Sequence, residues 1–373
     1  MKIGDIAKFQ NGFAFKSKDF KRNGEFPIIK IKELKDGEVK FFSDSAYVDV
    51  ELEDGYRKYL VQEDDILFAL TGDPVNKPNP LSWVGRVSIY KHKEKALLNQ
   101  RVCKLLPSKN VNPKYIYYFF RDFENFYKLA SLATGSASQA NISTKTIENV
   151  EIDLPPIEIQ NRVVEYLDAI SKKIEINNQI NNNLEQQAHA IFSSMFPSTS
   201  SGEKCIGDTI IPKRGKTLLS KNAVSGDVPV VAGGLEPATY HNTSNTLPPV
   251  LAISASGANA GYVSLWNKPI WSSDSSYIDS SMTKDVYFWY VLLKKRQQEI
   301  FDAQTGSAQP HIYPQHIASM PMIDISQKEI SKFTTIVTPI FEMIGHNKEE
   351  NIRLATLRDT LLPMLMSQKN DNF

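Results

Sequence analysis

The sequence has few cysteines and no long hydrophobic run. Its 373 residues include two cysteines, Cys103 and Cys205, which are far apart and outside any CxxC spacing. Neither a disulfide framework nor a structural zinc site is therefore expected. No apolar stretch is long enough to cross a membrane, and the N-terminus MKIGDIAKF turns polar too early for a signal peptide. We expect a cytoplasmic protein that has no membrane partner.

An excess of charge is also missing. The chain has 43 basic and 42 acidic side chains, a net charge of +1. This balance excludes a protein that is held on nucleic acid by bulk charge alone. A nucleic-acid-binding function would require local basic patches, or a partner protein that supplies much of the phosphate contact.

Catalytic motifs are absent as well. The prolines of 154–156 and 247–249 lack the flanking residues of an amino-methyltransferase motif, and the six histidines form neither HxxxH nor HExxH. There is no GxGxxG after a strand, no GxxxxGK[ST] and no GxSxG elbow. We therefore expect no catalytic residue, metal site or cofactor site in this chain.

Six short motifs occur twice in the same order. They are Ile3–Asp5 and Ile206–Asp208, Phe26–Ile29 and Val228–Val231, Ile66–Gly72 and Val250–Gly257, Gly85–Ser88 and Gly261–Ser264, Tyr115–Tyr118 and Tyr287–Tyr290, and Thr134–Ala137 and Thr305–Ala308. Six ordered matches indicate an internal duplication. The spacing drifts, so the loops differ, and the second copy lacks a counterpart to much of 73–82. This pattern suits two readers of different ligands; a duplicated domain with no role in recognition is the alternative.

Each copy ends in a long stretch with a seven-residue apolar period. In the first copy the two series are Val163, Ile170, Asn177, Leu184, Ile191 and Leu167, Ile174, Asn181, Ala188, Met195. Adding 170 gives Phe333, Ile340, Asn347, Leu354, Leu361 and Val337, Ile344, Asn351, Arg358, Leu365, in which Arg358 is the charged exception. This is the period of a coiled-coil seam. Helices are expected over 156–197 and 323–370, the second starting around Ser326, and Pro339 either kinks it or marks its first turn.

Two asparagines interrupt each seam near its middle, Asn177 and Asn181 in one and Asn347 and Asn351 in the other. A buried Asn amide needs a partner and can thereby fix the register of two helices. A frayed or solvated stretch is the alternative. If a pseudo-two-fold axis relates the copies, the helices pair antiparallel, and Asn177 faces Asn351 while Asn181 faces Asn347.

The stretches 1–155 and 202–322 are expected to be mostly β-structure with one long helix each. Gly, Pro, Asn and Asp separate short apolar runs, which predict strands at Ile66–Leu70, Val84–Tyr90, Val102–Leu105, Val250–Ser254, Gly261–Trp266 and Ser276–Ile278. The helices are expected over Pro113–Leu132 and Lys284–Phe301. The fold class is α+β: two tandem, mostly-β domains, joined and separated by two long antiparallel coiled-coil helices.

Polar and basic side chains cluster in the predicted loops. Arg and Lys suit phosphates and guanine edges, whereas Asn and Gln suit adenine edges. The candidates for contact with DNA are Lys16, Lys18, Lys21, Arg22, Asn76, Lys77, Ser82, Gln139, Lys213, Arg214, Lys216, Ser254, Ser256, Asn259 and Gln309. Gln139 and Gln309 belong to the segments TGSASQAN (134–141) and TGSAQPH (305–311). Each segment is either a loop near DNA or a turn that docks against the helix of its own unit.

The segments Leu154–Asp168 and Ile176–Leu184 resemble the conserved helical region of type I restriction–modification specificity subunits. The TGSA turns and the tandem layout are similar to that family too, over almost the whole chain. The resemblance implies that each globular unit is a target recognition domain, that the two helices act as a spacer, and that the pair reads a split target in double-stranded DNA.

The resemblance also implies partners that carry the chemistry. Two copies of a DNA methyltransferase subunit would methylate adenine N6 with S-adenosylmethionine, and restriction/translocase subunits would use ATP and Mg²⁺. The chain itself would be non-catalytic and hold no cofactor. Two alternatives remain open: a specificity chain of a type II-like restriction system, and a structural adaptor whose duplicated β-rich modules bind proteins.

Overall fold

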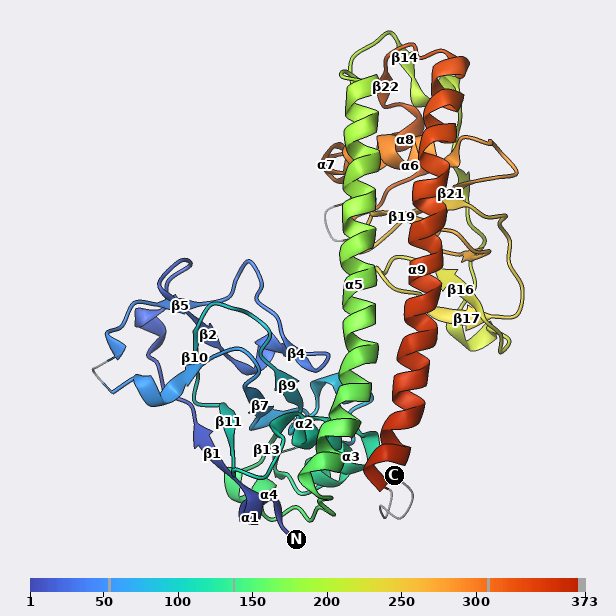
Figure 1. Cartoon of the computed structure of the whole chain (residues 1–373). Coiled ribbons are helices and arrows are strands. Elements are labelled where there is room, and N and C mark those ends of the chain that lie inside the picture. The colour runs from blue at the N-terminus through green and yellow to red at the C-terminus, as the bar shows by residue number, and fades with distance from the viewer. Residues whose placement is uncertain (53–54, 137, 307–308, 368–373) are drawn as a thin grey trace. The chain divides into compact units, whose positions relative to one another are not determined.

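The computed structural model describes residues 1–52, 55–136, 138–306 and 309–367 (Figure 1). The chain forms two compact units. Unit 1 combines residues 1–172 with the described residues from 353 onward, and unit 2 comprises residues 173–352. Each unit therefore contains one globular part and a portion of each long helix. Helix α5 spans Ile157–Met195 and α9 spans Gln327–Ser367.

The main sheet of unit 1 has the strand order β1-β11-β7-β9-β4-β3. In that order the strands are Ala7–Asn11, Val102–Pro107, Ile66–Ala69, Val87–Ile89, Glu38–Val39 and Leu34–Lys35. A second sheet, β5-β2-β10-β6, consists of Tyr47–Val48, Phe26–Ile29, Ala96–Leu98 and Leu60–Val61. A third, β12-β13-β8, consists of Thr134–Ser136, Gln139–Asn141 and Thr71–Gly72. The helices of the globular part are α1 Ile3–Ile6, α2 Pro113–Arg121, α3 Phe123–Ser131 and α4 Thr144–Glu148.

The main sheet of unit 2 has the strand order β15-β21-β18-β19. These strands are Lys213–Arg214, Ser275–Asp279, Val250–Ser254 and Val263–Trp266. A second sheet, β17-β16-β20, consists of Thr239–His241, Val228–Val231 and Trp271–Ser272, and β14 (Lys204–Cys205) pairs with β22 (Pro321–Met322). The helices of the globular part are α6 Val286–Lys295, α7 Gln297–Asp302 and α8 Pro314–Ala318.

The two units share one internal plan. The order β1-β11-β7-β9 corresponds to β15-β21-β18-β19, and each second sheet contains one parallel pair, β2 with β10 and β16 with β20. The glycines of the repeated GxVS motif correspond as well, because Gly85 and Gly261 have φ of +83° and +84°. A Cβ at Gly85 would meet Leu129 and Ile142, and one at Gly261 would meet Ile300 and Ile312. The repeated motifs of the sequence therefore occupy equivalent places in two related structures.

The prediction of one continuous helix in each globular part is wrong. The structure has two helices, α2 and α3, in place of Pro113–Leu132, and two helices, α6 and α7, in place of Lys284–Phe301. Asp122 separates α2 from α3 with an extended backbone, and its carboxylate accepts a hydrogen bond from the Asn125 N–H. Arg296 separates α6 from α7. Because Asp is a favoured N-cap, Asp122 starts a new helix at a point where the apolar pattern of the sequence continues.

The long helices begin close to where the sequence predicts. Helix α5 starts directly after Pro156 and α9 starts after Ser326, whose hydroxyl and Glu329 form a capping box. Helix α9 is continuous through Pro339, so the prediction that Pro339 could mark its first turn is wrong. Residues 368–370 of the predicted second helical region lie outside the described residues.

Both helices contribute apolar side chains to each core. In unit 1, Val163 and Leu167 of α5 share a buried cluster with Leu362 and Met366 of α9. In unit 2, Phe333 and Val337 of α9 share a buried cluster with Phe192 and Phe196 of α5. A shift of 170 positions converts one set into the other. The same heptad positions therefore build both cores, since burial of large apolar side chains is the main source of stability.

The four seam asparagines lie in unit 2 and contact one another in the expected pairs. The Asn177 amide donates to Asn351 Oδ1 over 2.9 Å, and the Asn347 amide donates to Asn181 Oδ1 over 2.8 Å. Residue numbers rise along α5 and fall along α9 through these contacts, so the helices are antiparallel there. Asn177, Asn181 and Asn347 are at most 7% exposed. Buried amides of this kind require a partner, which is the physical basis of the predicted role in register.

Replacing one asparagine of a pair is expected to cost more than replacing both. Asn347→Leu leaves the Asn181 amide buried without a partner, a loss of about 1–3 kcal/mol in the free energy of unfolding. Adding Asn181→Leu removes that unpaired group and should recover most of the loss. Chemical denaturation of the four variants of a double-mutant cycle measures the coupling. Exposed Asn183→Leu on the same helix serves as the control, and additive effects at 181 and 347 would contradict the pairing.

Candidate functional site

In unit 2, four segments meet where the strands of the main sheet end. The Gly215 N–H donates to the Ser275 carbonyl over 2.8 Å, and the Ala255 N–H donates to the Asp274 carbonyl over 3.1 Å. The fourth segment joins through the Gly257 N–H, which donates to the Pro310 carbonyl over 3.0 Å. We call this meeting of 214–215, 254–257, 272–275 and 309–312 the strand-end junction of unit 2.

Polar side chains of the unit 2 junction contact one another. The Arg214 guanidinium donates to Asp274 Oδ1 over 2.6 Å, and the Ser256 hydroxyl donates to Asp274 Oδ2. Both oxygens of this carboxylate are therefore bound by side chains of neighbouring segments. The Arg214 and Asp274 side chains are 40% and 37% exposed, so the pair lies at the surface.

Unit 1 has an equivalent junction with the same backbone hydrogen bonds. The Gly12 N–H donates to the Val102 carbonyl over 3.0 Å, and the Leu70 N–H donates to the Arg101 carbonyl over 2.9 Å. The Ile142 N–H donates to the Leu70 carbonyl, as the Ile312 N–H donates to the Ala255 carbonyl in unit 2. These bonds make 11–12, 69–72, 99–102 and 139–142 the strand-end junction of unit 1.

The equivalent positions carry different side chains. The backbone bonds align Asn11 with Arg214, Thr71 with Ser256, Arg101 with Asp274 and Asn141 with His311. In unit 1 the Thr71 hydroxyl donates to Asn141 Oδ1 over 2.8 Å, while Asn11 and Arg101 are exposed. The same backbone arrangement therefore presents the amide of Asn11 and the guanidinium of Arg101 in unit 1. In unit 2 it presents the ion pair of Arg214 and Asp274.

The TGSA segments form part of both junctions. In unit 1, β12 pairs with β13, which pairs in turn with β8. In unit 2, Thr305 and Ser256 both form bridges with His311. A Cβ at Gly135 would meet the Gln139 carbonyl and one at Gly306 the Gln309 carbonyl, so the two glutamines are equivalent, and both are exposed. Ala137, Ser307 and Ala308 of these segments lie outside the described residues.

Several predicted candidates lie at or beside the junctions. Arg214, Ser256, Gln139 and Gln309 belong to them, and Ser254 ends β18 with 4% exposure. Lys213 and Lys216 flank Arg214 and are exposed. Asn259 lies in the loop that follows Ser256, where its carbonyl accepts from the Tyr262 N–H. In unit 1, Asn76, Lys77 and Ser82 lie in the loop between β8 and β9, which the Trp83 indole closes by donating to the Lys77 carbonyl.

The remaining candidates lie in another segment of unit 1. Lys16 precedes the short helix Ser17–Asp19, Lys18 lies within it, and all of Lys16, Lys18, Lys21 and Arg22 are exposed. Lys21 forms an ion pair with Asp49 at 2.5 Å, and both side chains are about half exposed. The described contacts do not connect this segment with the junction.

Sequence reasoning missed Asn11, Thr71, Arg101, Asn141, Asp274 and His311. The signal for Asn11 was present, because the offset of 203 that relates Gly4 to Gly207 also relates Asn11-Gly12 to Arg214-Gly215. Asp274 and Arg101 gave no signal, since only backbone pairing shows that they are equivalent.

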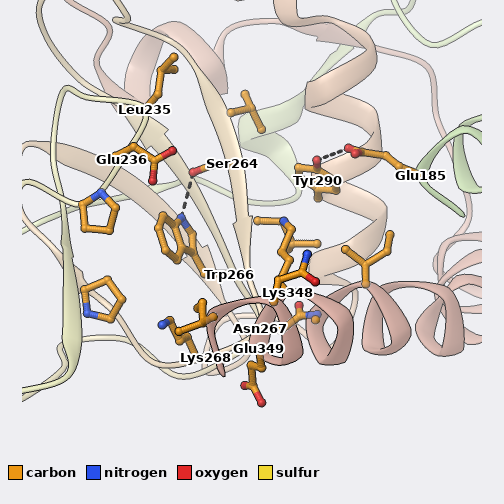
Figure 2. A pocket seen from close by; sticks show the side chains of 18 of the residues that line it. Glu185, Leu235, Glu236, Ser264, Trp266, Asn267, Lys268, Tyr290, Lys348 and Glu349 are labelled. Carbon is orange, nitrogen blue, oxygen red and sulfur yellow. Dashed lines mark hydrogen bonds between the residues drawn. The ribbon is translucent and has the colours of Figure 1, made fainter. Parts of the chain in front are cut away.

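A groove of about 560 Å³ in unit 2 is a second candidate site (Figure 2). Leu235, Trp266 and Lys348 line it, and the Tyr290 hydroxyl donates to Glu185 at its edge. Burial and the Glu185 carboxylate raise the pKa of Tyr290, so the phenol stays a neutral donor. In unit 1 the equivalent Tyr118 hydroxyl donates to Asp168 Oδ1 over 2.6 Å. Tyr118 thus attaches α2 to α5, and Tyr290 attaches α6 to α5. Because both copies have this contact, we interpret it as structural and not as part of a binding site.

The groove also contains a close approach between Asn267, which directly follows β19, and α9. The Asn267 amide donates to the Phe341 carbonyl, and a Cβ built on Gly345 would lie 2.2 Å from Asn267 Nδ2. Glycine at 345 is therefore required by packing, although glycine lowers helix stability.

The described residues contain neither a cluster of metal-ligating side chains nor a helix that could span a membrane. Over 1–52, 55–136, 138–306 and 309–367, no group of three or more His, Cys, Asp or Glu could hold a metal ion. None of the helices described has the length and hydrophobicity to span a membrane.

Residues 1–186 of the 373 match the family described as "Type I restriction modification DNA specificity domain". The chain belongs to this family. The EcoBI specificity subunit of Escherichia coli is 27% identical over 174 residues, 46% of this chain and 32% of that protein. The MjaIX specificity subunit of Methanocaldococcus jannaschii is 22% identical over 324 residues, 76% of this chain and 74% of that protein. The match thus spans about a third of the E. coli relative's length and about three quarters of the archaeal one.

A solved structure shares the fold of this specificity-family chain. The type I restriction–modification S subunit from M. genitalium superimposes with a TM-score of 0.61 at 17% sequence identity. The superposition covers 99% of this chain and 96% of that one.

The contact between Asn267 and Gly345 gives a test of how the globular part of unit 2 is attached to α9. Gly345→Ala alone should destabilise the chain, because the new methyl group overlaps the Asn267 amide. In the Asn267→Gly background, which removes both the amide and the Cβ of residue 267, the same change should stabilise, by up to about 1 kcal/mol, since alanine favours a helix interior over glycine. Thermal unfolding of the two single variants and the double variant measures this reversal of sign. Destabilisation of equal size in both backgrounds would rule the contact out.

Proposed function

We propose that this chain is the DNA-specificity subunit of a type I restriction–modification complex and reads a bipartite, asymmetric target. The observation that carries the proposal is the pair of strand-end junctions, which share backbone hydrogen bonds and differ in polar side chains. Two copies of one scaffold with different surface chemistry suit the recognition of two different short sequences. Membership of the specificity family supports the same conclusion.

In this proposal residues 1–155 and 202–322 are two target recognition domains, and 156–197 and 323–370 form an antiparallel coiled-coil spacer. The heptad period and the Asn177–Asn351 and Asn181–Asn347 pairs support the coiled coil. A helix of 39 residues is about 58 Å long, which exceeds the 34–36 Å of one turn of DNA. A rigid spacer of this kind would fix the gap between the two half-sites.

The proposal assigns the chemistry to partner subunits. Two copies of a DNA methyltransferase subunit would bind S-adenosylmethionine and methylate adenine N6, and restriction/translocase subunits would use ATP and Mg²⁺. The relatives named above are subunits of type I restriction enzymes, which supports an assembly of this type. The net charge of +1 is accounted for if these partners provide much of the phosphate contact.

One observation favours a second candidate, a structural adaptor that binds proteins through its duplicated modules. The balance of 43 basic and 42 acidic side chains is unusual for a protein that grips DNA by itself. The experiment below separates the two functions, because an adaptor would not set the sequence that is methylated.

Methylation mapping of genomic DNA, in cells with and without this chain, tests the proposal. One split motif should be methylated when the chain is present and unmethylated after its deletion. Exchange of 202–322 for the same region of a relative should change one half of that motif, and exchange of 1–155 should change the other half. A motif that persists without the chain, or methylation without sequence preference, would contradict a role in specificity.

A further inference from the structure

The strand-end junctions differ most where their side chains can reach a ligand. Both junctions lie at the ends of the main-sheet strands, where Asn11 pairs with Cys103 and Arg214 pairs with Ser276. The central strands β7 and β18 are buried, whereas Asn11, Arg101 and Arg214 are exposed. Burial constrains these two strands to mostly apolar residues in both copies. The exposed ends are free of that constraint, so they can carry different recognition chemistry on one backbone.

Arg214 is a junction residue whose side chain is held by a neighbouring segment. Its guanidinium donates one N–H to Asp274 Oδ1, and Asp274 Oδ2 accepts from Ser256. An arginine has five N–H donors in a planar fork, so this contact leaves others available. A side chain that is held before binding loses less conformational entropy when it binds. The aspartate therefore prepares the arginine for a bidentate contact.

We propose that Arg214, positioned by Asp274, reads a guanine in the half-site bound by residues 202–322. A guanidinium fork matches the O6 and N7 acceptors of guanine in the major groove, and this is the commonest specific contact between a side chain and a base. The exposed Lys213 and Lys216 on either side of Arg214 suit the flanking phosphates. The inference rests on the proposed function of the chain as a specificity subunit.

A buried hydroxyl on the same face of the sheet as Arg214 supports a ligand at this position. Ser276 is 2% exposed, and its Oγ has no hydrogen-bond partner among the described residues. Ser276 pairs with Arg214 in the sheet, so the two side chains lie on one face. A buried hydroxyl without a partner is unfavourable. A base held by Arg214, through a bridging water, would supply the missing partner.

The proposed contact between Arg214 and guanine concerns only the half-site bound by residues 202–322. Asn11 replaces Arg214 in unit 1, and Arg101 replaces Asp274. Unit 1 therefore lacks an arginine that is held by a carboxylate at this position, and its amide suits adenine in place of guanine. Variants of Arg214 are expected to leave the other half-site unchanged.

The test uses methylation mapping with the full chain and its partner subunits. Arg214→Ala should make one G·C position degenerate in the half-site of residues 202–322, with a drop of about 10- to 100-fold in the preference for guanine there. Arg214→Lys keeps the charge but has no planar fork, so it should relax the same position. Lys284→Ala, which removes one exposed charge from the same unit, is the control and should leave the motif unchanged.

Asp274→Asn tests the positioning role. It keeps the size of the side chain and removes the charge that holds Arg214. The same single position should relax, by less than in Arg214→Ala, while the rest of the motif is retained. Loss of the entire half-site would instead indicate a general structural role for Asp274 and would overturn its assignment.

Two results would overturn the inference about Arg214 and leave the proposed function intact. One is an unaltered motif in both Arg214 variants. The other is a uniform loss of methylation at all sites with the motif unchanged, which is the behaviour of a phosphate contact. Failure of the wild-type chain to confer any motif would refute the proposed function itself, so the two failures are distinguishable.

Discussion

A buried amide must be paired, and this constraint connects the two long helices. Apolar side chains alone would allow α5 and α9 to slide by one heptad, since each seam repeats every seven residues. The Asn177–Asn351 and Asn181–Asn347 contacts disfavour that shift, because a shift of one heptad would set the Asn181 amide against Ile340 or Leu354, which offer no hydrogen bond. Once the register is fixed, the same helix positions reach each core: Val163 and Leu362 in unit 1, and their counterparts in unit 2.

Comparison of the two copies distinguishes core positions that both copies share from exposed positions that differ between them. Gly85 and Gly261 share a positive φ and equivalent apolar neighbours, and Tyr118 and Tyr290 both donate to a carboxylate on α5. Such positions serve the core, so both copies retain them. At the strand ends the backbone hydrogen bonds are kept while the exposed side chains differ. The exposed side chains of the junction can therefore differ while its backbone hydrogen bonds stay the same.

The sequence predicts the repeated parts of this structure because periodicity and repetition are local signals. The bounds of α5, the strand Val250–Ser254 and the pairing of the asparagines follow from spacing. The break at Asp122 does not, because the apolar pattern continues through it and the cap depends on local backbone geometry. The junction was found only in part: Arg214 and Ser256 were candidates, but Asp274 meets them through strand pairing across 60 and 18 residues of sequence.

The Arg214–Asp274 pair shows how one scaffold can carry different polar side chains at equivalent positions. At the equivalent positions unit 1 has Asn11 in place of Arg214 and Arg101 in place of Asp274, so the ion pair is present in one copy and not in the other. Exchange of two exposed side chains therefore suffices to convert an amide into a carboxylate-held guanidinium. The neighbouring strand differs at this point by one buried residue, because Asn11 pairs with Cys103 and Arg214 pairs with Ser276. Because an exposed ion pair contributes little to stability, its conservation would depend on the ligand that it recognises.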